Sequence, residues 1–261
     1  MTNNKPPLVT IITVVFNGKI YIEETIQSVI GQTYKNIEYI VIDGGSNDGT
    51  VDIISKYANN ITYWISEPDK GIYDAMNKGI KVAKGEWLNF LNAGDSYIDN
   101  KVLANVFESD LSDATIIYGD IKVLNENGES YYRKAITLKD KKSILKGMLI
   151  CHQAIFYGKE IIEFYDATLR IMAEWKHLIN LTEHPNFKPL KFEFPFVYYR
   201  LGGLSSQQSQ WTFLEYKTVF FNEYGRFNYI KHSPFFTYMA FKRFLKRLFH
   251  IQNNYLNFII F

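Results

Sequence analysis

The sequence predicts an α/β fold in which helices cover a mostly parallel sheet. Short apolar and β-branched runs alternate with helical stretches through the first 120 residues, and glycine, asparagine or aspartate follows several of these runs. Such alternation is typical of parallel strands joined by covering helices. The chain has 261 residues, of which 47% are hydrophobic and 16% aromatic, so it can bury a well-filled core.

Composition narrows the classes of function. A formal net charge of +2 is too small to indicate a nucleic-acid partner. The single cysteine, Cys151, excludes an internal disulfide and is typical of a reducing compartment. Residues 1–7 have no apolar signal core, and no apolar run is long enough to span a bilayer, so we expect a cytoplasmic protein.

The first half of the chain shows the clearest elements. Residues 8–16 are a β-branched run with little alternation, which is typical of a strand covered on both faces. Residues 20–30 follow as a helix, because isoleucine and valine recur on one face. The other elements expected here are a strand at 37–42, a helix at 50–57, a strand at 61–65, a short helix before residue 85, and strands at 87–91 and 114–118.

The second half is less regular. An Asn-Gly turn separates expected hairpin strands at 121–124 and 130–133. A helix is expected at 169–181 and an aromatic-rich strand at 192–200. Residues 139–146 are a basic helix or loop to which no chemistry can be assigned.

Two carboxylates are expected to meet at one edge of the sheet. Asp43 ends the second strand and opens a loop at 43–49, and Asp95 follows the strand at 87–91. Ligands of open parallel sheets collect outside the carboxyl ends of the strands. A nucleotide would suit this edge, with Asp43 accepting from the base or ribose and Asp95 holding a divalent ion on the diphosphate. Plain turns capped by aspartate remain the alternative for both loops.

Four stretches, 9–17, 41–50, 66–80 and 91–95, resemble family 2 glycosyltransferases of the GT-A fold, in the family's order. The likeness is greatest to the branch that builds bacterial O-antigen, capsular and colanic acid polysaccharides. The resemblance implies a GT-A, Rossmann-like sheet. It also implies an inverting transfer of a hexose from a UDP-sugar that depends on Mn²⁺ or Mg²⁺.

The resemblance assigns donor-side roles by position. Phe16 lies where the family places an aromatic ring against the base, and Asp43 lies in the base-contacting loop. Asp95 matches the metal-binding acid. Lys70 and Asp74 are further candidate donor contacts, for which a solvated surface lysine and a helix N-cap are the alternatives.

This chain departs from the family pattern at both acidic loops. Gly44 and Gly94 stand where many relatives carry a second acid. Ribose contacts are therefore expected from the backbone or from Asn92, and metal affinity is expected to be modest. The resemblance also places the glycine segment at 201–206 near the donor diphosphate, where glycines permit close approach and Arg200 is expected to contribute charge. A simple surface turn is the alternative for that segment.

The acceptor side depends on two further motifs. The resemblance places the acceptor beside His152 and Gln153. It places the general base at Glu174, where relatives usually have an aspartate followed by an aromatic residue. Inversion requires one carboxylate to take the proton of the attacking hydroxyl. Asp166 is the second choice, and a solvent-facing surface glutamate is the alternative for Glu174.

The C-terminal stretch at 235–250 predicts a basic amphipathic helix that lies on an anionic membrane or packs on the domain. The resemblance implies a polyprenyl-diphosphate-linked sugar as acceptor, so we expect a peripheral protein on the inner face of the cytoplasmic membrane. We expect a nucleotide-sugar-binding half at 1–120, an acceptor half at 121–210 and a helical extension at 211–261. A nucleotidyltransferase and a non-catalytic nucleotide-sugar-binding module remain open. The sequence does not determine the sugar or the oligomeric state.

Overall fold

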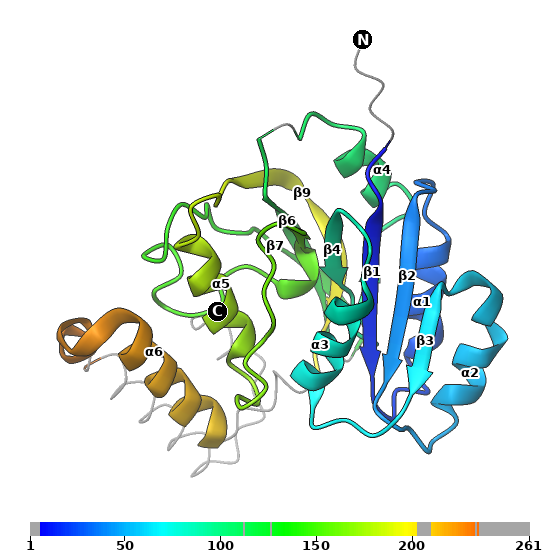
Figure 1. Cartoon of the computed structure of the whole chain (residues 1–261), viewed down its shortest axis with the longest axis horizontal. Coiled ribbons are helices and arrows are strands. Elements are labelled where there is room, and N and C mark those ends of the chain that lie inside the picture. The colour runs from blue at the N-terminus through cyan, green and yellow to red at the C-terminus, as the bar shows by residue number, and fades with distance from the viewer. Residues whose placement is uncertain (1–5, 112, 126, 203–209, 233, 235–261) are drawn as a thin grey trace.

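The computed structural model describes residues 6–111, 113–125, 127–202, 210–232 and 234 (Figure 1). Its strands are β1 (Val9–Val15), β2 (Ile37–Asp43), β3 (Tyr63–Ser66), β4 (Trp87–Phe90), β5 (Ser96–Tyr97), β6 (Ile116–Leu124), β7 (Ser130–Arg133), β8 (Ile155–Gly158) and β9 (Pro189–Arg200). Its helices are α1 (Ile22–Ile30), α2 (Thr50–Lys56), α3 (Ile72–Val82), α4 (Val102–Phe107), α5 (Ala173–Thr182) and α6 (Gln210–Lys231), with single 3-10 turns at Ala58–Asn60 and His152–Ala154.

In the described residues these strands form one nine-stranded sheet in the order β3-β2-β1-β4-β8-β6-β9-β5, with β7 paired to β6. The β3-β2-β1-β4 part is parallel throughout. The strand–helix alternation predicted for the first half is therefore confirmed. β1, β2 and β4 are almost wholly buried, which explains why their sequences are apolar without alternation.

The second half of the sheet mixes strand directions. β8 inserts antiparallel between β4 and β6, whereas β9 runs parallel to β6 and antiparallel to β5. The predicted hairpin is confirmed as β6 and β7. β8 was not predicted, because four buried residues after a turn have no period that separates a strand from a loop.

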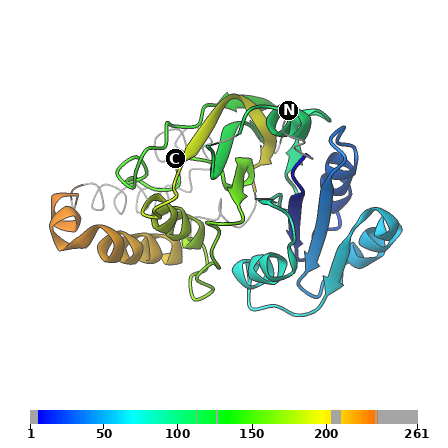
Figure 2. The ribbon, with the colours of Figure 1, turned by 45° about the horizontal axis from the view of Figure 1, so that its top comes forward.

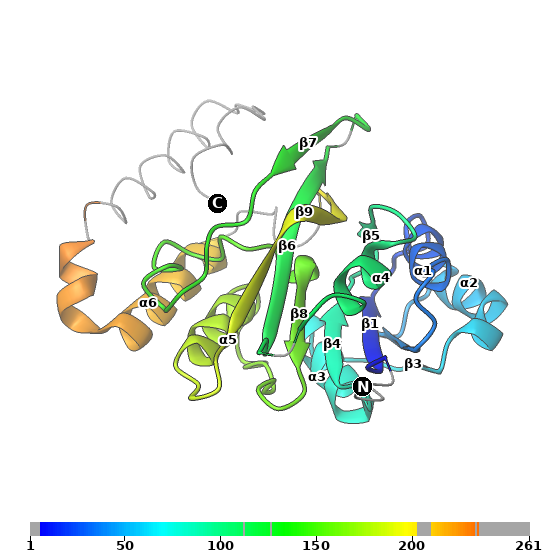
Figure 3. The same cartoon turned by 90° about the horizontal axis from the view of Figure 1, so that it is seen from above.

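The sheet has a core on each face. α3, α5 and α6 contribute to one core, and α1, α2 and α4 to the other. Figure 2 shows α2 toward one end of the molecule and α6 at the other. Seen from above, α5 and α6 gather beside β6 and β8, away from α1 and α2 (Figure 3). Because β1, β2 and β4 are parallel, their carboxyl ends share one edge of the sheet. α5 and α6 lie toward the other half of the sheet (Figure 3).

Two expected features lie partly or wholly outside the described residues. They are the glycine segment at 201–206 beyond residue 202, and the helix at 235–250. In the part of the chain that the structure describes, no helix has the length and apolar character to cross a membrane.

Candidate functional site

The loops after β1 and β2 hold one another by hydrogen bonds. The Asn17 N–H donates to Ser46 Oγ at 2.7 Å, and the Asn47 N–H donates to Asn17 Oδ1 at 3.0 Å. The Gly18 N–H donates to Thr50 Oγ1 at 3.0 Å. Asn17 has a φ of 49°, in the left-handed region that asparagine tolerates better than most residues. The two loops therefore form one platform at the sheet edge.

Asp43 organises this platform from inside. Its side chain is fully buried and accepts hydrogen bonds from the Gly45 N–H at 3.1 Å and the Ser46 N–H at 2.9 Å. The hydroxyls of Ser46 and Ser66 donate to it at 2.5 and 2.6 Å. The structure thus places Asp43 where it shapes the loop expected to receive a nucleotide.

Phe16 and an unpredicted acid border the same platform. Phe16 is 65% exposed. A Cβ added at Gly44 would lie 2.4 Å from Asp69 Oδ2 and 3.4 Å from Phe16 Cδ2. The space for a second acid at position 44 is therefore filled by the Asp69 carboxylate. Sequence reasoning missed Asp69 because it comes from a different loop, between β3 and α3.

Lys70 and Asp74 lie at the start of α3. Asp74 Oδ2 accepts the Lys70 N–H at 3.1 Å and lies 3.8 Å from Lys78 Nζ. Asp74 thus makes contacts in the first turn of α3 that stabilise a helix start, whereas the N-cap residue itself is Gly71. The Lys70 side chain is exposed and follows Asp69 directly in the chain.

Asp95 lies after β4 in a nearly buried position. The Arg200 N–H at the end of β9 donates to Asp95 Oδ1 at 2.9 Å, and Arg200 Nε donates to the Gly94 oxygen at 3.1 Å. The same guanidinium pairs with Glu24 at 2.7 Å. Burial raises the pKa of Asp95 to about 7, although Arg200 and the Gln153 side chain oppose the rise.

The surroundings of Asp95 fit a divalent cation. Burial disfavours its charged form, and a cation beside the carboxylate would offset that cost. Asn92 Oδ1 in the same turn is buried without a hydrogen-bond partner among the described residues. Such oxygens suit Mg²⁺ or Mn²⁺ when a phosphate and water complete the shell. The described residues contain no cluster of three His, Cys, Asp or Glu, so phosphate and water would supply the remaining ligands of an ion held here.

Glu174 lies in the first turn of α5 and is coupled to Asp95. Burial raises the pKa of Glu174 to about 8, and the charge of Asp95 contributes to the rise. Asp166 instead pairs with Lys176 at 2.7 Å. That ammonium, together with the Thr168 hydroxyl, lowers the pKa of Asp166 to about 2. Of the two candidates, Glu174 is much the stronger base.

A carboxylate from α6 holds the start of α5. Glu215 accepts hydrogen bonds from the backbone N–H groups of residues 170–172, at 2.8, 2.9 and 3.2 Å. A negative charge is favourable at this end of a helix. Trp175 stacks on Tyr216 with ring centroids 4.7 Å apart and planes within 6° of parallel. α6 therefore fixes the turn that carries Glu174.

His152 and Gln153 lie in the turn before β8, and both are buried. The His152 ring stacks on Phe90 at 5.1 Å, and its Nδ1 lies 3.1 Å from Tyr157 Oη. Burial lowers the pKa of His152 to about 3, so the imidazole is neutral at neutral pH. Through Gln153, whose side chain contacts Asp95, this segment joins the aromatic core to the acidic edge.

β1 links the two acidic loops. Val15 pairs with Asp43 on one side, and the Ala93 N–H donates to the Val14 oxygen at 3.2 Å on the other. A Cβ at Gly18 would lie 3.5 Å from that of Ala93. The loops that carry Asp43 and Asp95 therefore flank β1 at one edge of the sheet, as predicted for a nucleotide site.

Comparison with known sequences shows what this arrangement resembles. Residues 10–172 match the model of the family described as glycosyl transferase family 2. A PGL/p-HBAD biosynthesis glycosyltransferase of Mycobacterium tuberculosis is 32% identical over 190 residues, which are 69% of this chain and 71% of that protein. An uncharacterised glycosyltransferase of Rickettsia bellii is 41% identical over 130 residues, covering 48% of this chain and 19% of that protein.

Solved structures share the fold at lower identity. TarS of S. aureus has a TM-score of 0.65 and 16% identity, covering 82% of this chain and 64% of that one. The mannosyltransferase PcManGT of Pyrobaculum calidifontis, solved with GDP-Man and Mn²⁺, has a TM-score of 0.54 and 15% identity, covering 73% and 56%. The chain thus spans less than two thirds of these solved proteins. The likeness shows a GT-A fold.

Proposed function

The chain belongs to glycosyl transferase family 2, and we propose that it is an inverting hexosyltransferase that uses a UDP-sugar. The observation that carries the proposal is the electrostatic interaction of Asp95, which is buried, with Glu174, which is half-buried; the two carboxylates come from separate elements and both have raised pKa values. One suits a metal-bound diphosphate and the other suits the proton of an acceptor. Structural neighbours solved with UDP-GlcNAc and with UDP, GalNAc and Mn²⁺ support the choice of donor and ion.

We assign the donor to the platform and the acidic turn beside it. Phe16 would stack on the base, and Asp69 with the loop shaped by Asp43 would contact the ribose. Asp95 and Asn92 would hold Mn²⁺ or Mg²⁺. The ion would neutralise the charge that develops on the departing diphosphate.

We assign the general base to Glu174. The acceptor oxygen attacks C1 of the sugar from the face opposite the diphosphate, so a C1–O bond to the acceptor forms as the C1–O bond to the diphosphate breaks. The hydroxyl proton passes to Glu174. Its raised pKa strengthens it as a base. Three buried tyrosines have a pKa that is raised by burial and further by the charge of Glu174; they are Tyr73, Tyr157 and Tyr165. We propose that they keep water from the reacting sugar.

We propose a polyprenyl-diphosphate-linked saccharide as acceptor, in bacterial surface polysaccharide assembly such as O-antigen or capsule. The motif order in the first 95 residues and the basic C-terminal stretch support this. In this scheme residues 1–120 bind the donor, 121–210 the acceptor, and 211–261 bring the enzyme to the inner face of the cytoplasmic membrane.

The proposal is tested by donor binding followed by transfer. UDP-sugars are screened for thermal stabilisation that requires Mn²⁺ or Mg²⁺, and the best donor is offered to a lipid-diphosphate-linked sugar. Asp95→Asn should lose the metal-dependent stabilisation and the transfer. Glu174→Gln should keep the stabilisation while turnover falls by roughly 10²–10⁴-fold. Asp52→Asn, on the exposed side of α2, is the matched control.

Two results would contradict these roles. One is full transfer by Asp95→Asn, and the other is weakened UDP binding with unchanged turnover in Glu174→Gln. Release of diphosphate from a nucleoside triphosphate and a sugar phosphate would instead identify a nucleotidyltransferase. Metal-dependent UDP-sugar binding without transfer or hydrolysis would identify a binding module.

A further inference from the structure

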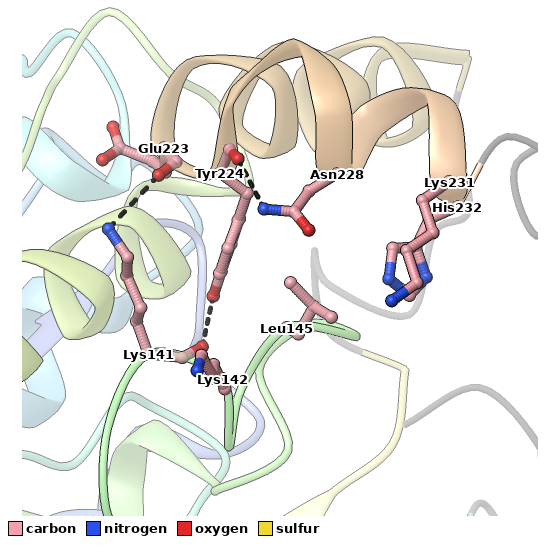
Figure 4. A pocket seen from close by; sticks show the side chains of 8 residues that line it. All are labelled: Lys141, Lys142, Leu145, Glu223, Tyr224, Asn228, Lys231 and His232. Atoms are coloured by element: carbon pink, nitrogen blue, oxygen red, sulfur yellow. Dashed lines mark hydrogen bonds between the residues drawn. The ribbon is translucent and has the colours of Figure 1, made fainter.

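A basic pocket lies between α6 and the segment at 139–147, outside the residues assigned to transfer. Its volume is about 390 Å³, and its lining consists of Lys141, Lys142, Leu145, Glu223, Tyr224, Asn228, Lys231 and His232. Figure 4 shows Lys231 and His232 extending from the end of α6, with Leu145 between them and the wall that carries Lys142. A space of this volume accepts a polar headgroup as well as a bare ion.

The positive charge of this pocket is only partly neutralised. Lys141 pairs with Glu183, and its ammonium also donates to the backbone oxygen of Glu223 at 3.5 Å. Within the described ranges, no ion pair is formed by Lys142 or Lys231, and both side chains are exposed. With Glu223 as the one carboxylate in the lining, the pocket favours an anion.

A bend in α6 shapes the pocket. Gly225 has a φ of 78°, which lies in the left-handed region and separates two helical parts of α6. Before the bend, the Tyr224 hydroxyl donates to the Lys141 oxygen at 2.7 Å. After it, Asn228 Nδ2 donates to the Tyr224 oxygen at 2.9 Å. The bend thereby places Lys231 across from the 139–147 segment.

Exposed apolar side chains accompany these lysines. Phe227 is 79% exposed and Ile230 is 60% exposed. Each immediately precedes a residue of the pocket, Asn228 and Lys231 respectively. Exposed apolar side chains beside lysines are typical of an element that lies in a membrane interface. The exposed Phe227 and Ile230 side chains would not be needed to bind a soluble anion.

We propose that this pocket binds the phosphate-bearing headgroup of an anionic membrane lipid. Lys142 and Lys231 would contact the phosphate oxygens, while Phe227 and Ile230 enter the boundary between headgroups and acyl chains. The inference deepens the membrane-lipid part of the proposed function. Its test measures binding to membranes without any sugar transfer. Failure of the lipid pocket is therefore distinguishable from failure of the proposed transferase activity.

The pocket is joined to the proposed base through packed side chains. Trp175, the neighbour of Glu174, donates its Nε1–H to the Ile144 oxygen at 2.8 Å and stacks with Tyr224 at 6.1 Å between centroids. One wall of the pocket is therefore one layer from α5. A headgroup held there would bring a lipid-linked acceptor close to the helix that carries Glu174.

The test is co-sedimentation of the full chain with phosphatidylglycerol vesicles and with phosphatidylcholine vesicles. We expect binding to phosphatidylglycerol only, weakened at least about tenfold by the pair Lys142→Gln and Lys231→Gln, since each lysine near an anionic surface contributes to affinity. The matched control is the pair Lys56→Gln and Lys101→Gln, exposed lysines outside the pocket, which should bind like the wild type.

The variant Leu145→Phe distinguishes binding inside the pocket from attraction of the vesicle to surface lysines. Its larger side chain fills the pocket, and every lysine is kept. It should weaken binding like the lysine pair; Asn228→Phe serves the same purpose if Leu145→Phe does not fold by circular dichroism. Equal loss in both lysine pairs, no loss in either, or full binding by the filled variant would overturn the proposal. So would binding of inorganic phosphate or diphosphate to the pocket without any preference for phosphatidylglycerol vesicles.

Discussion

At the scale of single residues, Asp95 and Glu174 owe their unusual proton affinity to the same main cause. Both carboxylates are withdrawn from water, and burial is the largest contribution to the pKa of each. Their mutual repulsion adds to the rise for Glu174. Offsetting the charge of Asp95 would therefore also ease ionisation of Glu174. The proposed metal acid and the proposed base are linked through one electrostatic interaction.

The raised pKa of Glu174 predicts the direction of the pH–rate profile. A general base works in its deprotonated form, so kcat/KM for the donor should rise with pH and level off above about 8. Below about pH 8 the rate should fall about tenfold for each pH unit, because the deprotonated fraction of Glu174 falls by that factor. Initial rates across the pH range measure this. The residual rate of Glu174→Gln should lack the limb, and a wild-type profile that declines through this range would exclude Glu174 as the base.

Asp69 shows how a residue can be absent from every motif and still border the site. It lies against Gly44 from the loop between β3 and α3, and it also accepts the Gly71 N–H at 2.8 Å. The apparent loss of an acid at position 44 is thus compensated by a neighbouring loop. No spacing in the sequence indicates this, because the contact depends on how β2 and β3 pair.

At the scale of elements, α6 has a clear task in the described structure. Its Glu215 caps the N-terminus of α5, and its Tyr216 covers Trp175. A helix that packs on α5 and not in the sheet thereby controls the position of Glu174. Helix caps of this kind contribute about 0.5–2 kcal/mol each.

This arrangement predicts the effect of Glu215→Gln. The variant loses the charge and one acceptor at the start of α5, so Glu174 should be held less well. We expect kcat to fall about tenfold or more while KM for the UDP-sugar changes little, as for an interaction needed only in the transition state. The ascending limb of the rate profile, which Glu174 sets, should shift as well, and a purely structural defect would not cause that shift.

Steady-state kinetics and the pH profile measure both effects. Glu163→Gln removes an exposed carboxylate from the segment that leads to α5 and should behave as the wild type. Equal loss of donor affinity and turnover in Glu215→Gln would mean that α6 supports the fold in general and not the base in particular.

At the scale of the whole molecule, the sheet is what unites the site. β9 returns to pair with β5, Ser96 with Tyr198, and this pairing brings the Arg200 N–H to Asp95. β8 inserts next to β4 and carries the His152–Gln153 turn to the same edge. Both pairings join strands that are distant in sequence. Both also bury ionisable or polar groups, which lowers the free energy of unfolding.

That cost predicts a stabilising substitution at the site. The folded-state pKa of Glu174, about 8, lies above its ordinary value of 4.5. The folded protein therefore holds a proton that the unfolded chain releases, so stability is full below about pH 4.5 and is lost as pH rises through about 8. Glu174→Gln carries no such titration. Its thermal midpoint should exceed that of the wild type at about pH 9, by several degrees, and match it near pH 4.

Asp166→Asn gives the opposite case. The Lys176 ammonium and Thr168 hydroxyl lower the pKa of Asp166 to about 2, from an ordinary 3.8. Its contribution is present above about pH 3.8 and lost as pH falls through about 2, so the asparagine variant should be less stable at neutral pH. Scanning calorimetry of both variants at several pH values measures the difference.

A Glu174→Gln protein that melts lower than the wild type at high pH would contradict the burial of an ionisable base.

The sequence alone determined the parallel half of the sheet, the hairpin and the acids that follow β2 and β4, because these are properties of neighbouring residues: a run of apolar side chains, a turn dipeptide, a carboxylate after a strand. It also carried the family resemblance that the family match confirms. Tertiary structure decided the direction of β8, the acid beside Gly44, the cap on α5 and the proton affinity of Asp95 and Glu174. Each of these depends on which distant segments exclude water from one another, and burial of that kind is a property of the packed chain and not of any stretch within it.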